Sequence, residues 1–131
     1  MQKDITKLKF SSLNKQSFNV IYANLSLHYF KDIVTTDIFS SLYDLLALDG
    51  FLFVRCKSVN DFLYGRGTEI EKDMFNNNGK MQHLFSVEYL DQKLHQFSVV
   101  RIRKSSSKHL TMENGVVKSH FVEAIAQKKN K

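Results

Sequence analysis

The chain has 131 residues, 43% of them hydrophobic and 12% aromatic, and this content predicts a packed core rather than a disordered chain. The length fits a single domain over residues 1–131, and no apolar run or leader-like start predicts a membrane span or secretion, so we expect a cytoplasmic protein. The formal charge of +6 leaves nucleic acid open as a partner, whereas the single cysteine excludes an internal disulfide and a cysteine-based metal site.

The first clear element is a strand at residues 18–23, which follows a polar N-terminal segment. Its residues, FNVIYA, are mostly apolar on both faces, and a polar turn begins at Asn24. Strands of this kind lie inside parallel sheets that are covered by helices. We therefore expect this strand near the centre of an α/β sheet.

An amphipathic helix and a second strand follow. Thr35 or Thr36 can cap the helix, whose apolar residues recur at helical spacing. Gly50 supplies the turn into a strand at 51–57, which is also apolar on both faces. Because a strand, a helix and a strand in this order predict a right-handed crossover, a ligand site is expected beyond the carboxyl ends of the two strands.

Residues 58–85 form the least regular part of the sequence. We predict a short helix at about 68–75 and a turn in the Asn-Asn-Asn-Gly segment at 76–79. Ser86 is a good N-cap for a further helix that ends near Leu94.

The C-terminal part predicts an antiparallel hairpin. Its strands are expected at 97–103 and 120–126, with a long polar turn at 104–118 between them. Arg101 and Arg103 fall on one side of the first strand and fit the exposed face of an edge strand.

Two segments carry a resemblance to a known family. SFNVIYANLSLHYF at 17–30 resembles the fourth strand and following loop of class I S-adenosylmethionine-dependent methyltransferases, and LLALDGFLFVRCKS at 45–58 resembles the next strand of that family. The later segments GRGTEIEKDM, HLFSVEYLDQKL and SHFVEAIAQKK are similar to the closing part of a bacterial branch related to tellurite-resistance methyltransferases.

The resemblance implies an α/β fold: a partial Rossmann-like methyltransferase sheet, mostly parallel, with a C-terminal antiparallel hairpin. In family order, the strand at 120–126 lies between those at 51–57 and 97–103. The family's glycine-rich cofactor loop and its ribose-binding acid have no counterpart, so the chain resembles only the C-terminal part of the domain. Gly65 and Gly67 follow the wrong strand for such a loop and are expected to form a plain turn.

The cofactor that the resemblance implies is S-adenosylmethionine, with four contact residues. Asp4 would accept a hydrogen bond from the adenine amino group and Ile5 would pack on the ring, although Asp4 can equally be a solvated residue. Asn24 and Leu25 would contact the methionine moiety. Because the glycine-rich loop is missing, we expect the isolated chain to bind the cofactor weakly or not at all.

Catalytic roles fall on His28 and Tyr29, which the resemblance places at the methyl-transfer site. A histidine there can deprotonate an acceptor near neutral pH, but it can equally be a helix-packing residue. Polar residues after the second strand would lie at the acceptor site or be ordinary surface charges; they are Arg55, Lys57, Asp61, Tyr64, Glu69 and Glu71. No histidine has metal-ligand spacing, so no metal site is expected.

Two functions remain open at this point. The first is methyl transfer to an unknown small acceptor, by a partial domain that is inactive alone. The second is a basic, non-catalytic module that binds nucleic acid or a protein. We also expect a homodimer, formed through the edge of strand 18–23 or by exchange of the N-terminal segment, or a complementing N-terminal half that is supplied by another polypeptide.

Overall fold

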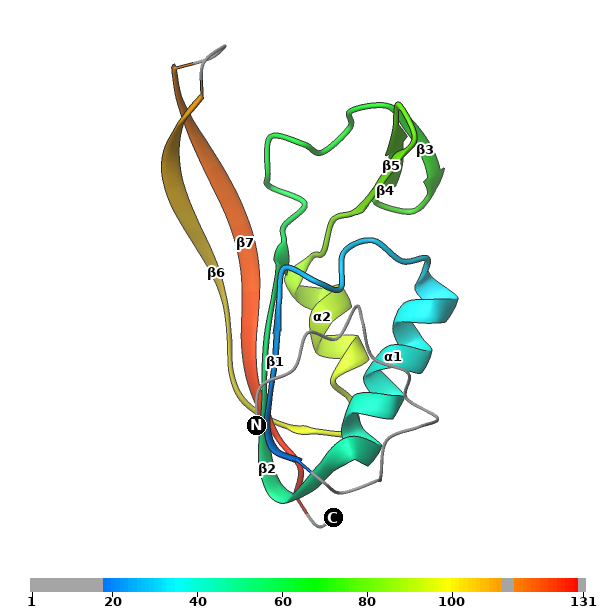
Figure 1. The fold of residues 1–131 in the computed structure, drawn as a ribbon, viewed down its shortest axis with the longest axis vertical. Coiled ribbons are helices and arrows are strands. Elements are labelled where there is room, and N and C mark those ends of the chain that lie inside the picture. Colours follow the sequence, from blue (N-terminus) through cyan, green and yellow to red (C-terminus); the bar gives the residue numbers. More distant parts are fainter. Residues whose placement is uncertain (1–17, 112–114, 130–131) are drawn as a thin grey trace.

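The computed structural model describes residues 18–111 and 115–129. The elements of the described residues, in chain order, are β1 (Phe18–Asn24), α1 (Asp32–Leu45), β2 (Leu46–Lys57), β3 (Thr68–Glu71), β4 (Met74–Asn77), β5 (Lys80–His83), α2 (Val87–Lys93), β6 (Ser98–Thr111) and β7 (Gly115–Gln127). Figure 1 shows one sheet with both helices on the same side and a small second sheet beyond one end of α1 and α2.

The main sheet has the strand order β1-β2-β7-β6. β1 and β2 are parallel, with Val20 opposite Phe51 and Asn24 opposite Arg55, and β7 is antiparallel to β2 and to β6. The parallel pairing of the two strands joined by α1 and the position of the last strand between β2 and β6 are therefore confirmed. The expectation of a mostly parallel sheet is wrong for the described residues, because the inserted strand β7 makes two of the three strand pairs antiparallel.

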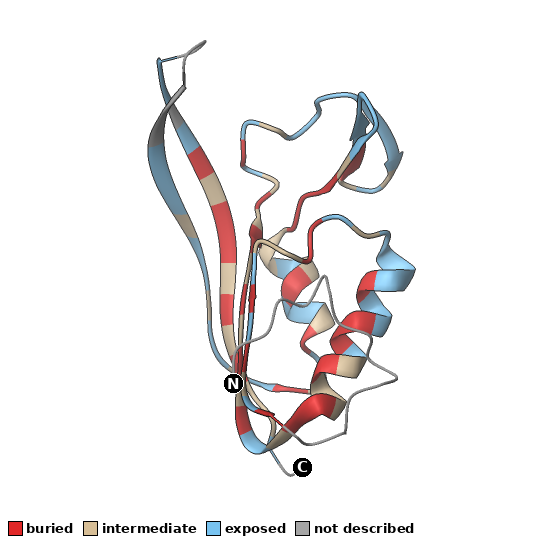
Figure 2. Cartoon of the chain, viewed as in Figure 1, coloured by how far each residue is buried: buried red, intermediate tan, exposed pale blue. Residues whose placement is uncertain are grey.

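The hydrophobic core lies between one face of this sheet and the two helices. Its members alternate along the strands and recur at helical spacing along α1, as the buried stripes in Figure 2 show. Fully buried members include Ile21, Phe39, Leu42, Leu52, Cys56, Leu90, Leu94 and Val122. Burial raises the pKa of the Cys56 thiol, as expected for an inert packing residue.

The opposite face of the sheet has no covering element among the described residues. We call this surface the open face; its members on β1 and β2 include Val20, Tyr22, Phe51 and Phe53. Tyr22 remains 40% exposed. The two-sided apolar pattern of β1 predicted helices on both faces, but in the described residues they cover only one.

Helix α1 begins three to four residues earlier than the predicted caps. The hydroxyl groups of Thr35 and Thr36 donate to the carbonyls of Lys31 and Asp32, so they bond within the first turn and cap nothing. At the other end, Gly50 lies inside β2 rather than before it. A Cβ there would sit 2.8 Å from the Ala47 carbonyl oxygen, so this position requires glycine.

The predicted helix at 68–75 is wrong. These residues form β3 and β4, which pair with β5 in a three-stranded antiparallel sheet. Asp73 adopts a left-handed conformation (φ 61°) between β3 and β4, which ends any helix at that point. The predicted turn at 76–79 is confirmed, because Asn78 and Gly79 both have positive φ and join β4 to β5.

The terminal hairpin is longer than predicted. Most of the expected polar turn at 104–118 belongs to β6 and β7, which pair from Ser98 opposite Gln127 to Thr111 opposite Gly115. Cross-strand hydrogen bonding keeps this polar sequence extended although it has little apolar content. Ser86 does cap α2, since its side chain accepts from the backbone N–H of Tyr89 at 3.0 Å.

Candidate functional site

The loop after β1 leaves the sheet in a sharp turn at the edge where β1 and β2 both end. Leu25 adopts a left-handed conformation (φ 57°), and its backbone N–H donates to the Arg55 carbonyl oxygen at 2.8 Å. A non-glycine residue in this region costs about 1–2 kcal/mol. Backbone strain of this kind clusters at functional sites, so the turn indicates a candidate functional site at the carboxyl edge of the sheet.

The residues predicted to contact a cofactor lie on this turn or outside the described part. Asn24 is exposed, Leu25 is half-buried, and Leu27 anchors the loop in the core. The Oγ atom of Ser26 is buried without a partner among the described residues. Asp4 and Ile5 lie outside the described residues.

The two predicted catalytic residues are adjacent but lie in different environments. His28 is only 2% exposed, whereas Tyr29 is 42% exposed. Their ring centroids are 4.3 Å apart, and Nδ1 of His28 has no hydrogen-bond partner in the described part of the chain. The structure brings these side chains together, and their catalytic role stays a prediction.

Burial lowers the pKa of His28 to about 4, and the positive charges of Lys57 and Lys80 act in the same direction. Asp61 opposes the shift, and His83 adds slightly to it. The imidazole is therefore neutral at neutral pH, where it can exchange hydrogen bonds but is a weak base.

Asp61 is a buried structural anchor. It is 3% exposed, and its carboxylate accepts from the backbone N–H groups of His120 at 2.8 Å and Leu63 at 3.2 Å. The Lys57 ammonium lies 3.9 Å away. These contacts tie the segment after β2 to β7, so Asp61 is not the ordinary surface charge that sequence reasoning allowed.

His83 joins the small sheet to the loop after β1. Its backbone N–H donates to the His28 carbonyl at 2.7 Å, and its Nδ1 lies 2.8 Å from the Phe30 carbonyl. A carbonyl only accepts, so Nδ1 carries the proton in this contact. Sequence reasoning missed His83 because its partners are more than fifty residues away and no local motif signals them.

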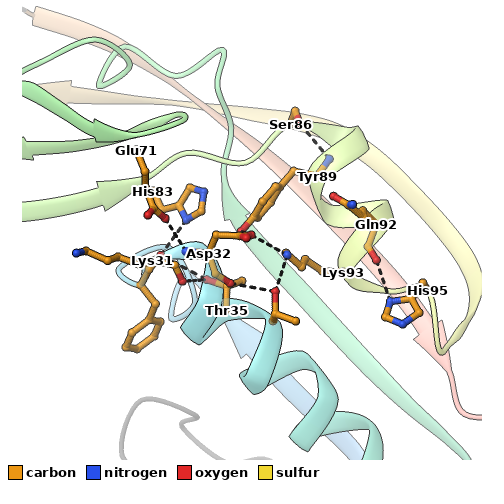
Figure 3. A network of polar contacts seen from close by, with 12 residues as sticks. Lys31, Asp32, Thr35, Glu71, His83, Ser86, Tyr89, Gln92, Lys93 and His95 are labelled. Atoms are coloured by element: carbon orange, nitrogen blue, oxygen red, sulfur yellow. Dashed lines mark hydrogen bonds and ion pairs between the residues drawn. The ribbon is translucent and has the colours of Figure 1, made fainter.

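A polar network centred on Asp32 connects α1, α2 and the small sheet (Figure 3). The Asp32 carboxylate accepts from Lys93 Nζ at 2.7 Å and from the Tyr89 hydroxyl at 2.6 Å, and its backbone N–H donates to Glu71 at 2.6 Å. The hydrogen bonds from Lys93 and Tyr89 lower the pKa of Asp32. Burial and the bond to Asp32 raise the pKa of Tyr89.

A polar cleft of about 680 Å³ opens beside this network. Its lining includes Asp32, Glu71, Asp73, His83, Glu88 and Tyr89. Tyr64 donates to Asp73 at 2.6 Å, and that bond raises the pKa of Tyr64 to about 12. The structure thus separates the predicted acceptor residues: Glu71 lines the cleft, whereas Arg55 lines a hollow on the open face.

Neither a metal cluster nor a membrane helix is found where the structure describes the chain. No three His, Cys, Asp or Glu side chains of residues 18–111 and 115–129 are placed to hold an ion together. None of the helices within those ranges is long and apolar enough to cross a bilayer.

The sequence matches no protein-family profile and no curated protein. Solved structures do match its fold. A SAM-dependent methyltransferase from Methanosarcina mazei has a TM-score of 0.65 and 18% identity, with 98% of this chain and 66% of that chain covered. TehB from Haemophilus influenzae has a TM-score of 0.64 and 13% identity, with 97% and 40% covered.

A third match is the 1,6-didemethyltoxoflavin-N1-methyltransferase of Burkholderia thailandensis, solved with 1,6-didemethyltoxoflavin and S-adenosylhomocysteine. Its TM-score is 0.63 at 17% identity, with 96% of this chain and 48% of that chain covered. The chain spans 40% to 66% of the lengths of these three proteins. At such identities the likeness concerns the fold alone: this chain is similar in fold to part of S-adenosylmethionine-dependent methyltransferases.

Proposed function

We propose that this chain is the C-terminal part of an S-adenosylmethionine-dependent methyltransferase domain of the tellurite-resistance branch, which methylates a small acceptor. The observation that carries the proposal is the strained turn at Leu25, at the carboxyl end of β1, in a sheet of methyltransferase-like order. Ligands of doubly wound sheets bind outside the carboxyl ends of strands, where the strand order reverses.

The polar groups at this edge fit the methionine end of the cofactor. The exposed amide of Asn24 and the backbone of Leu25 would bind it, and the buried Ser26 hydroxyl has an unused hydrogen-bonding capacity among the described residues. Asp4 and Ile5 would hold the adenine. When bound, the sulfonium supplies a methyl group that is already activated for displacement.

The acceptor would enter the polar cleft beside Asp32 and His83, next to the loop that carries His28 and Tyr29. Because the methyl carbon is activated, positioning the acceptor and excluding water supply much of the catalysis. The neutral His28 imidazole would orient the acceptor and Tyr29 would border the entrance. The isolated chain is expected to be inactive, since it lacks a glycine-rich cofactor loop.

A nuclear magnetic resonance titration with S-adenosylhomocysteine tests this function. We expect shifts concentrated at Asn24, Leu25 and Ser26, with a dissociation constant of about 1 mM or weaker, a binding free energy near 4 kcal/mol. Asn24→Ala should reduce these shifts, whereas Asn60→Ala, an exposed amide elsewhere, should not. If the resonances of this loop did not respond, the proposed cofactor site would be wrong. If the affinity were low-micromolar, the proposal that the site is incomplete without a glycine-rich loop would be wrong.

The alternative function is a basic, non-catalytic binding module. The observation in its favour is the group of Arg55, Arg101 and Arg103 around the hollow of about 430 Å³ on the open face. A second nuclear magnetic resonance titration, with a single-stranded RNA, tests this alternative. Shifts confined to these arginines would favour the binding module over methyl transfer.

A further inference from the structure

The polar cleft beside the Asp32 network carries a local excess of negative charge in a basic protein. Among the described residues that line the cleft, four are acidic and one is basic; they are Asp32, Glu71, Asp73, Glu88 and Lys72. The chain as a whole has a formal net charge of +6. Because a cleft with charges of one sign concentrates ligands of the opposite sign, this cleft attracts cations although the whole molecule repels them.

The acidic side chains of the cleft keep much of their charge for a ligand. Only Asp32 is compensated by a nearby cation of the described part, since Lys93 Nζ lies 2.7 Å from its carboxylate. Neutral donors hold the next two carboxylates: Glu71 accepts from the backbone N–H of Asp32, and Asp73 accepts from the Tyr64 hydroxyl, both at 2.6 Å. These hydrogen bonds orient the carboxylates without cancelling their charge.

His83 adds an independent requirement, a donor on the ligand. Its side chain lines the cleft although the residue is only 2% exposed, and Figure 3 shows it beside Glu71 and Tyr89. Since Nδ1 donates to the Phe30 carbonyl, the neutral ring has its lone pair on Nε2. No described residue donates a hydrogen bond to Nε2, and an enclosed acceptor without a donor is unfavourable. Nε2 therefore favours a ligand with an N–H or O–H group.

We propose that the polar cleft binds the primary ammonium group of a small cationic molecule. The carboxylates of Glu71, Asp73 and Glu88 supply the attraction, and Nε2 of His83 accepts a hydrogen bond from one N–H. An ammonium group has three donors and no acceptor, which matches a lining of carboxylates and one imidazole lone pair. This assignment rests on the proposed function in taking the bound amine as the methyl acceptor, whereas the binding itself needs no cofactor.

Three other ligands fit this cleft less well. A metal ion would suit carboxylates and an imidazole, but no three such side chains in residues 18–111 and 115–129 are placed to hold one together. A quaternary ammonium group is attracted by the charge but has no N–H to donate to His83. An anionic acceptor is repelled by the same carboxylates that attract an amine.

Nuclear magnetic resonance titrations of the isotope-labelled full chain at pH 7 test the proposal with matched probes. The probes are benzylamine, which is protonated at this pH as other alkylamines are, benzyltrimethylammonium and benzyl alcohol. At low salt, benzylamine should bind about tenfold more tightly than the alcohol and about threefold more tightly than the quaternary ion. It should also shift the Nε2 resonance of His83, whereas that of His95, an exposed residue, should not move.

A charge-removing variant with a matched control sharpens the result. Asp73→Asn keeps an acceptor for Tyr64 and tolerates the left-handed conformation of this position (φ 61°), but it removes one charge from the cleft. It should weaken benzylamine binding about threefold and leave benzyl alcohol unaffected. Asp91→Asn removes an exposed charge from α2 outside the cleft lining, so it should change neither affinity.

Several results would overturn the proposal: no binding of benzylamine, equal affinities of the three probes, an unmoved His83 Nε2 resonance, or equal effects of Asp73→Asn and Asp91→Asn. Tighter binding of benzoate than of benzylamine would also do so. These titrations contain no cofactor. Amine binding without a response to S-adenosylhomocysteine would therefore refute the cofactor site alone, and the reverse result would refute only the amine site.

Discussion

Two buried ionisable side chains near the loop after β1, Asp61 and His28, differ in their polar partners. The Asp61 carboxylate accepts hydrogen bonds from two backbone N–H groups and lies beside the Lys57 ammonium. His28 has no such partner at Nδ1, so burial and the nearby lysines keep it neutral. A buried charge is tolerated when it is paired, and an unpaired group gives up its charge instead.

This difference predicts a pH dependence of stability. The folded-state pKa of His28 is about 4, below its ordinary value of 6.5, so the unfolded chain binds the proton more readily. The stability that neutral His28 contributes is complete above pH 6.5 and is lost as the pH falls towards 4, by roughly 3 kcal/mol in all.

Urea unfolding of the wild type and of His28→Gln at pH 7 and pH 4.5 measures the effect. The wild type should lose more stability than the variant over this interval, and His95→Gln, at an exposed site, should behave like the wild type. Equal losses in wild type and His28→Gln would show that His28 titrates normally in the folded protein.

At the scale of elements, the small sheet depends on one close approach between backbones. Gly65 and Gly67 both have positive φ, of 83° and 88°. A Cβ on Gly67 would lie 2.2 Å from the Asn76 carbonyl oxygen on β4, whereas a Cβ on Gly65 would meet nothing within 4 Å. Alanine substitutions at the two glycines therefore distinguish the free-energy cost of the left-handed backbone conformation from the cost of the steric clash with β4.

We predict that Gly67→Ala destabilises β3–β5 much more than Gly65→Ala does. Gly65→Ala should cost about 1 kcal/mol for its left-handed conformation, and Gly67→Ala at least about 1–3 kcal/mol more, since the backbone must move. Hydrogen exchange of the amides in β4 and β5 reports the loss locally. Similar exchange in the two variants would mean that β3 is not held against β4 as described.

At the scale of the whole molecule, the two edges of the main sheet differ. The outer strand β6 carries exposed charges at Arg101, Arg103, Lys104 and Lys108, which discourage further strand pairing. β1, with the sequence FNVIYAN, has no charged residue and no described partner on its outer side. β1 is therefore the edge strand that is open to pairing with another chain.

We therefore expect the isolated chain to self-associate through β1 at micromolar concentration. Light scattering should give a mass above 15.3 kDa, which Val20→Lys on β1 lowers towards that value because a charge on the edge strand opposes pairing. Val100→Lys on β6, a site already 58% exposed, serves as the control and should change nothing. A wild-type mass of 15.3 kDa would show that this edge is protected.

The parts of the structure that local sequence determined are those with a local physical cause. The positions of β1, of the body of α1 and of the Ser86 cap follow from apolar spacing and from a side chain that bonds three residues away. The resemblance to methyltransferases, carried by the same segments, predicted the place of β7 between β2 and β6 and directed attention to the turn at Asn24 and Leu25.

Tertiary structure alone decided the rest, because the deciding contacts join residues far apart in the chain. The small sheet replaced the predicted helix, and the long hairpin replaced the polar turn, since pairing with another strand outweighs weak local preference. The neutral state of His28, the link from His83 to Phe30 and an open face that no other described residues cover likewise depend on which groups meet in space. Local periodicity specifies elements, whereas burial and charge at a site depend on everything that packs around it.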